Sequence, residues 1–179
     1  MTRGNKIWAE LLQLVPIVSL AFPFILHGSV DLARASTGFL VAALLTLPVS
    51  FLVLRAGQLL NPILVGAALW LWLGAAAFNL PLAGLAAWLT ATQAFGLFVA
   101  AFAAGVGATV FSPFGFMACR GVDEPSVRRA SVALLVVSAL CCAWSWFFRH
   151  DIRLGGGAPF IVLNVVRRAL CLRASSRTD

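Results

Sequence analysis

Five long apolar runs, separated by short connectors that carry arginine, occupy residues 7–148 and constrain the fold more than any other feature. A helix needs about 20 mostly apolar residues to cross roughly 30 Å of hydrocarbon. Only 11% of the residues are charged, whereas soluble domains average about 25%. No polar stretch between the runs is long enough to fold as a soluble domain. The sequence therefore predicts an all-α membrane protein, with residues 1–179 forming a single integral membrane domain.

The predicted architecture is a polytopic bundle of five to six transmembrane helices. Asn61-Pro62 is a specific helix start, because asparagine caps helices and proline is favoured at the first helical position. The apolar run at 82–111 is too long for one untilted crossing, so we expect a break near Thr90–Gln93 and a short interfacial or re-entrant segment near 80–92. The predicted helices cover 7–27, 37–54, 62–78, 94–111 and 129–148, followed by a short C-terminal helix at 158–172.

The distribution of basic residues predicts the orientation. With a cytoplasmic N-terminus and five crossings, six basic residues lie inside and seven outside. A sixth crossing by the C-terminal segment leaves ten inside and three outside, namely Arg34, Arg149 and Arg153. Cytoplasmic loops usually carry the excess of lysine and arginine, which favours six crossings with both termini cytoplasmic. A five-crossing alternative, with the tail lying on the membrane surface, stays open. The expected location is a bacterial inner membrane.

Composition and motifs disfavour several functional classes. The net charge of +7 comes from connectors and tails, where arginine meets lipid headgroups, and no basic patch carries the aromatic platform that single-stranded nucleic acid needs. The four cysteines show no CxxC spacing and no partnered histidine, so no metal site is predicted. Phosphate-cradling glycine loops, nucleophile elbows and HExxH motifs are absent from the sequence. The sequence therefore does not favour an enzyme, and we expect no cofactor.

Small residues recur every four positions along the predicted helix 94–111. Such spacing places them on one helix face and lets a neighbouring backbone approach closely, which is a main source of helix association in lipid. We expect this helix to be central to the bundle, with its packing face formed by Gly96, Ala100, Ala104 and Ala108.

Two sets of aromatic residues are candidates for contact with a partner or ligand. Trp70 and Trp72 lie near the middle of a predicted helix, where each indole N–H needs an acceptor. Phe114 and Phe116 lie in an apolar segment directly after a helix end. Packing within the chain is the alternative for the tryptophans, and an interfacial turn is the alternative for the phenylalanines.

His27 and His150 are predicted to fall at the same membrane surface. Two histidines can ligate haem, a pigment or a metal, each with a nearby carboxylate to orient its ring. No metal-ligand spacing supports the pair, and histidines at helix ends are more often solvated or capping residues. A cofactor site at His27 and His150 is therefore kept as a third alternative for function.

The first functional hypothesis is an accessory, assembly or scaffolding subunit that packs against a larger membrane protein. Proton or ion coupling requires charged residues within the helices, and this sequence has almost none. Their scarcity disfavours a transporter of that kind and leaves an accessory role. The expected partners are the lipid bilayer and another membrane protein, not nucleic acid. The second hypothesis is a carrier or channel for a small neutral or lipid-like molecule. Its cavity would lie near Pro16, Pro23, Pro48 and Asn61.

Overall fold

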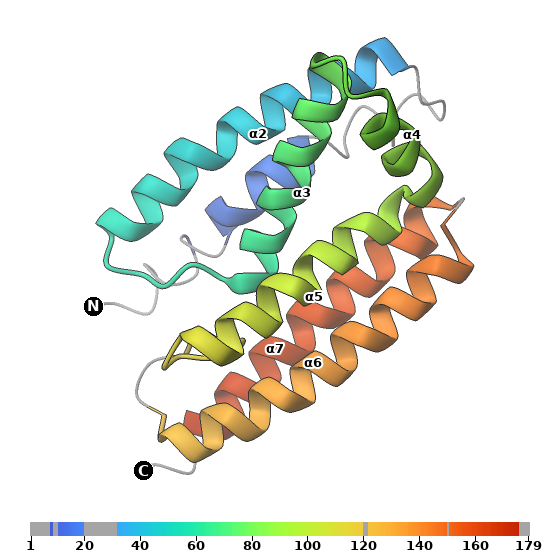
Figure 1. The fold of residues 1–179 in the computed structure, drawn as a ribbon. Coiled ribbons are helices and arrows are strands. Elements are labelled where there is room, and N and C mark those ends of the chain that lie inside the picture. The colour runs from blue at the N-terminus through green and yellow to red at the C-terminus, as the bar shows by residue number, and fades with distance from the viewer. Residues whose placement is uncertain (1–7, 9–10, 20–31, 120–121, 150, 176–179) are drawn as a thin grey trace. The chain divides into compact units, whose positions relative to one another are not determined.

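The structure is a computed structural model that describes residues 8, 11–19, 32–119, 122–149 and 151–175 (Figure 1). Every regular element within these residues is a helix. They divide into two compact units, which we describe separately: unit 1 comprises residues 1–60 and 67–91, and unit 2 comprises residues 61–66 and 92–179. The helices are α2 (Leu32–Arg55), α3 (Pro62–Asn79), α4 (Ala83–Thr92), α5 (Ala94–Phe111), α6 (Glu124–Phe147), the π-helix η1 (Ile152–Gly157) and α7 (Ala158–Ser175).

Five helices in the described residues are long and apolar enough to cross a membrane. They cover Ala35–Arg55, Pro62–Asn79, Ala94–Phe111, Glu124–Phe147 and Arg153–Ala174. The predicted all-helical architecture is thereby confirmed. Of the predicted first helix at 7–27, residues 11–19 are helical and residues 20–27 lie outside the described residues.

Three helices differ from their predicted bounds by several residues. α2 begins at Leu32 rather than at residue 37. α6 begins at Glu124 rather than 129, because the side chain of Asp123 accepts a hydrogen bond from the Ser126 amide (3.1 Å) and caps the helix before its apolar part starts. The C-terminal helix is not short, since it continues to Ser175. The preceding glycines wind into η1, so the candidate span reaches 22 residues. The carboxylate of Asp151 accepts amide hydrogen bonds at the start of η1.

The predicted break within the run 82–111 is confirmed at Gln93. This residue has φ 46°, a positive backbone angle that residues other than glycine rarely adopt. The chain cannot continue as one α-helix through such a residue, so α4 ends at Thr92 and α5 begins at Ala94. The expected interfacial placement of α4 stays a prediction.

In unit 1, polar side chains join α2 to α3. The indole N–H of Trp72 donates to the hydroxyl of Thr46 (3.0 Å), and the hydroxyl of Ser36 donates to the carboxamide of Asn79 (2.8 Å). The core of this unit consists of Phe39, Ala42, Ala43, Leu71 and Ala75. Aromatic rings extend it, because Phe39 lies edge-on to Trp70 with ring centroids 4.9 Å apart.

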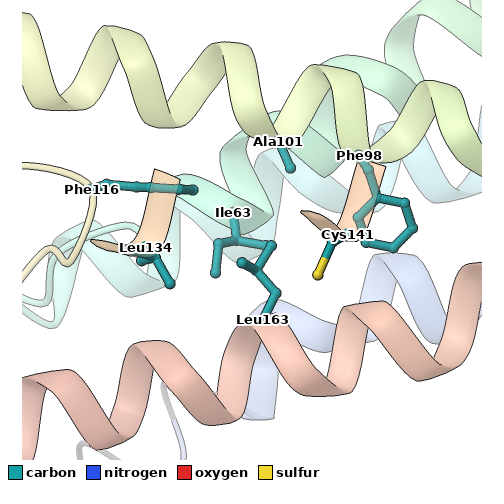
Figure 2. Packing of buried hydrophobic residues seen from close by; sticks show 7 residues of the cluster. All are labelled: Ile63, Phe98, Ala101, Phe116, Leu134, Cys141 and Leu163. Carbon is teal, nitrogen blue, oxygen red and sulfur yellow. The ribbon is translucent and has the colours of Figure 1, made fainter. Parts of the chain in front are cut away.

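In unit 2, α6 packs against both α5 and α7 (Figure 1), and Ile63 near the start of α3 belongs to the core that these helices form. Figure 2 shows the side chain of Ile63 among residues of all three helices. Gly66 permits this approach, since a Cβ there would lie 2.6 Å from the carbonyl oxygen of Ala100. The core consists of Ile63, Phe98, Ala101, Phe116, Leu134, Cys141 and Leu163.

Candidate functional site

Two asparagines form a hydrogen-bonded pair inside unit 2. Asn61 Nδ2 donates to Asn164 Oδ1 (3.2 Å), while Asn164 Nδ2 donates to the Phe160 carbonyl (2.9 Å). Asn61 Oδ1 accepts from the Ile63 amide (3.1 Å), so the same carboxamide also caps α3. Each carboxamide is thus hydrogen-bonded both to the backbone of its own helix and to the other carboxamide. The pair holds the start of α3 against the middle of α7.

A stripe of three serines runs along the buried face of α6. Ser131, Ser138 and Ser145 follow one another at intervals of seven residues, and all three are fully buried. Buried Val127 precedes the first serine, and Leu134 and Cys141 lie between the serines, which gives the seven-residue pattern of a tightly packed helix seam. Small hydroxyl-bearing residues allow neighbouring helices to approach closely in such a seam.

The three serine hydroxyls differ in their partners. Ser131 Oγ accepts a hydrogen bond from the buried amide of Phe116 (3.0 Å). Ser138 Oγ and Ser145 Oγ are buried and have no hydrogen-bond partner among the residues that the structure describes. A buried hydroxyl without a partner costs free energy, so these two positions are places where a polar group of a bound molecule would find an unused donor and acceptor.

The connector between α5 and α6 folds back into unit 2. Gly115 adopts φ 55°, and its turn brings the Phe116 amide to Ser131. Phe116 and Met117 are fully buried. The Met117 carbonyl then accepts a hydrogen bond from a guanidinium N–H of Arg167 (3.3 Å), which places this buried arginine against the connector.

The Met117 carbonyl also lies beside two sulfur atoms. Cys119 and Cys171 form a disulfide that joins the connector to α7, with their Cα atoms 6.1 Å apart. Both Sγ atoms lie near the Met117 carbonyl oxygen, at 3.5 and 3.7 Å respectively. Cys141 and Cys142 carry free thiols.

The predicted packing residues of helix 94–111 differ in how deeply they are buried. Gly96 is buried, whereas Ala100, Ala104 and Ala108 are half-buried. The deeply buried residues of α5 are Gly96, Phe98, Ala101 and Gly105, and the Phe116 ring lies directly against Gly105.

The aromatic candidates also lie in different surroundings. The Trp72 indole donates to Thr46, as expected of a tryptophan that packs against a neighbouring helix. The Trp70 indole N–H is buried, and no acceptor for it lies within the described part of the chain. The ring of Phe116 is enclosed by residues of its own chain, while Phe114 is partly exposed.

His27 and His150 both lie outside the described residues, so the structure does not show whether they meet. No group of three histidine, cysteine, aspartate or glutamate side chains within the described ranges is arranged to hold a metal ion. A cofactor site at these histidines stays a prediction.

The sequence reasoning missed the serine stripe, Asn164 and the Cys119–Cys171 disulfide. The stripe had a readable signal, because three serines at intervals of seven within an apolar helix share one face. The two pairs, Asn61 with Asn164 and Cys119 with Cys171, had none, since their members are 103 and 52 residues apart.

Comparison with known protein families, with curated proteins and with solved structures found no match to this chain.

Proposed function

We propose that this chain is a multi-pass inner-membrane protein that acts as an accessory or assembly subunit of a larger membrane protein complex. The observation that carries the proposal is an open face of small residues on α5. Ala103 is exposed, and a Cβ built on Gly107 would have nothing within 4 Å. Ala103 and Gly107 are four residues apart and therefore lie on one face of the helix.

An open small-residue face suits a second helix better than it suits lipid chains. Small residues four apart let a partner backbone approach closely, and van der Waals packing of this kind drives helix association in a bilayer. Exposed Val106 and Val110 border the face and would pack against the flanks of the incoming helix. Only 22% of the apolar window of α5 is buried within the chain, and Ala103, Val106, Val110 and Phe111 are exposed.

A pair of variants tests the proposal. The tagged protein is extracted in mild detergent, and the amount of a stoichiometric membrane partner is measured for Gly107→Leu and for Val136→Leu. Gly107→Leu fills the face and should reduce the bound partner by about tenfold, a loss of ~1.4 kcal/mol. Val136 is already large and exposed on α6, so its variant should retain the partner. Equal recovery in both variants, or a lone monomer in native lipid, would contradict the proposal.

A second candidate is a carrier for a small neutral solute, and the polar interior of unit 2 favours it. The Asn61–Asn164 pair and the two unused serine hydroxyls present neutral hydrogen-bonding groups among apolar helices. Osmotic swelling of proteoliposomes in glycerol measures such passage. Ser138→Val should slow the swelling, whereas Ala139→Val on the exposed side of α6 should not. Swelling no faster than in empty liposomes would exclude glycerol transport.

A further inference from the structure

The disulfide between Cys119 and Cys171 lies at the arginine-rich end of unit 2. Arg128 and Arg129 occupy the start of α6, and Arg167, Arg168 and Arg173 occupy the last half of α7. The opposite end of the same helices carries only Arg149 and Arg153 among the described residues. Under the positive-inside rule, the end with the cysteine pair faces the cytoplasm.

That orientation conflicts with a permanent disulfide. Glutathione and thioredoxin systems keep cytosolic thiols reduced, and disulfides there are usually transient and serve catalysis or redox sensing. Cys119 and Cys171 are half-buried rather than enclosed, so small reagents can reach the pair. Their Cα separation of 6.1 Å lies within the range that a disulfide spans.

We propose that Cys119 and Cys171 are a reversible thiol–disulfide modification site that fastens the α5–α6 connector to α7. The oxidant is a small disulfide of the glutathione class. This inference rests on the inner-membrane location given under the proposed function and on the orientation that the positive-inside rule favours, but not on the accessory role itself.

The exchange has two steps. The thiolate of one cysteine attacks the small disulfide, whose S–S bond breaks to give a mixed disulfide and one small thiolate. The second cysteine thiolate attacks the protein sulfur of the mixed disulfide and releases the other small thiolate. The two protons lost by the protein thiols pass to the departing thiolates. The cysteine pair loses two electrons, and the small disulfide gains them.

Oxidation would restrain the α5–α6 connector, whose side chains are buried in unit 2. Met117 and Phe116 are buried in unit 2, and Cys119 is only two residues beyond Met117. The crosslink therefore limits how far these side chains can withdraw from the helices. In the reduced protein the connector is still held by the Ser131 hydrogen bond to the Phe116 amide and by the Arg167 hydrogen bond to Met117.

Thiol trapping on the full-length protein tests the site. Expressing cells are quenched with acid, and the denatured protein is treated with a maleimide that adds a mass tag to each free thiol. The reduced protein takes four tags and the oxidised protein takes two, because Cys141 and Cys142 are free in both forms. The proposal predicts four tags in unstressed cells, two after diamide treatment, and four again after its removal. Cys119→Ser should take three tags in unstressed cells. After diamide its Cys171 has no partner thiol and should stop at the mixed disulfide, which adds the mass of one small thiol that the oxidised wild-type protein lacks.

Sealed vesicles of both orientations then locate the site. Glutathione disulfide does not cross the membrane, so it should oxidise the pair in inside-out vesicles and leave it reduced in right-side-out vesicles. Two tags under every condition would mean a permanent structural disulfide, and four tags under every condition would mean that the pair does not form. Oxidation only in right-side-out vesicles would place the pair on the other side. Each of these three results would overturn the proposal, and none of them bears on whether a partner binds Gly107.

Discussion

At the scale of single residues, the polar groups inside unit 2 determine which helix segments pair more specifically than the apolar side chains around them do. Asn61 is 5% exposed, yet both ends of its carboxamide are hydrogen-bonded. An amide buried among apolar helices is tolerated only with such partners, because an unmade hydrogen bond there costs about 1–3 kcal/mol. The pair with Asn164 therefore specifies how the first turn of α3 contacts α7 within unit 2.

A double-mutant cycle measures how strongly Asn61 and Asn164 are coupled. Asn61→Ser keeps a capping oxygen for the Ile63 amide but cannot reach Asn164, and Asn164→Ala removes the other member. We expect a coupling free energy of about 0.5–1.5 kcal/mol between the two positions. Denaturant unfolding in detergent, followed by tryptophan fluorescence, gives the four free energies of unfolding. Strictly additive single changes would show that the pair contributes nothing of its own.

Asp123 gives a pH-dependent prediction. Hydrogen bonds from the side chain and backbone of Ser126 lower the pKa of the Asp123 carboxyl below its ordinary value of 3.8. Because the pKa is lower in the folded protein, the cap makes its full contribution to stability at pH values above the ordinary aspartate pKa. This contribution is lost as the pH falls through the pKa that Asp123 has in the folded protein.

Hydrogen exchange at the first turn of α6 tests this cap. The Ser126 amide should lose protection as the pH falls below about 4, where the unfolded carboxyl titrates. Asp123→Asn is the control, since asparagine caps helices but does not titrate. The same pH dependence in both proteins would exclude Asp123 as its source.

At the scale of elements, α6 is the helix that organises unit 2. Its seven-residue repeat of small polar residues faces α5 and α7, whereas its exposed face is apolar and includes Val132, Val136 and Leu140. The polar side chains of α6 thus face inward, the reverse of a soluble helix. Serine is small enough to let neighbouring helices approach closely there, and Ser131 also accepts a hydrogen bond from the Phe116 amide.

Two alanine substitutions on this stripe should have different effects. Ser131→Ala leaves the buried Phe116 amide without its acceptor and should cost about 1–3 kcal/mol of unfolding free energy. Ser138→Ala removes a hydroxyl that has no partner and should change stability by less than about 0.5 kcal/mol, or raise it. Unfolding in detergent under identical conditions compares them. A larger loss for Ser138→Ala would mean that its hydroxyl has a partner in the folded protein.

At the scale of the whole molecule, the C-terminal segment distinguishes five from six crossings in the proposed membrane topology. Together η1 and α7 make a candidate span of 22 residues, long enough for a crossing despite Arg167 and Arg168 within it. Arg167 is accommodated because its guanidinium donates to the Met117 carbonyl rather than facing lipid. The positive-inside rule independently favours this crossing.

Reporter fusions test the crossing. A reporter placed after Asp179 should be active in the cytoplasm, whereas one placed after Phe148, before the last candidate span, should be active on the opposite side. Both reporters on the same side would restore five crossings, with the tail on the membrane surface.

Much of the helical organisation could be predicted from the sequence. The start of α3 at Pro62, the break at Gln93 and the bounds of α5 follow from capping residues and from the lengths of apolar runs. These features are local, since a helix satisfies its backbone hydrogen bonds within one segment whatever its neighbours are. The Asp123-Glu124-Pro125 sequence is itself a capped helix start, and α6 begins there, ahead of the bound at residue 129 where its apolar run begins after Arg128.

The tertiary structure alone decided which helix faces meet. Lipid chains and helix interiors are equally apolar, so hydropathy cannot distinguish the buried Ala101 from the exposed Ala103. The pairings of Asn61 with Asn164 and of Cys119 with Cys171 join residues distant along the chain, and they exist only once α3, the connector and α7 are neighbours. Local chemistry determined where helices form, and packing determined which polar groups they bring together.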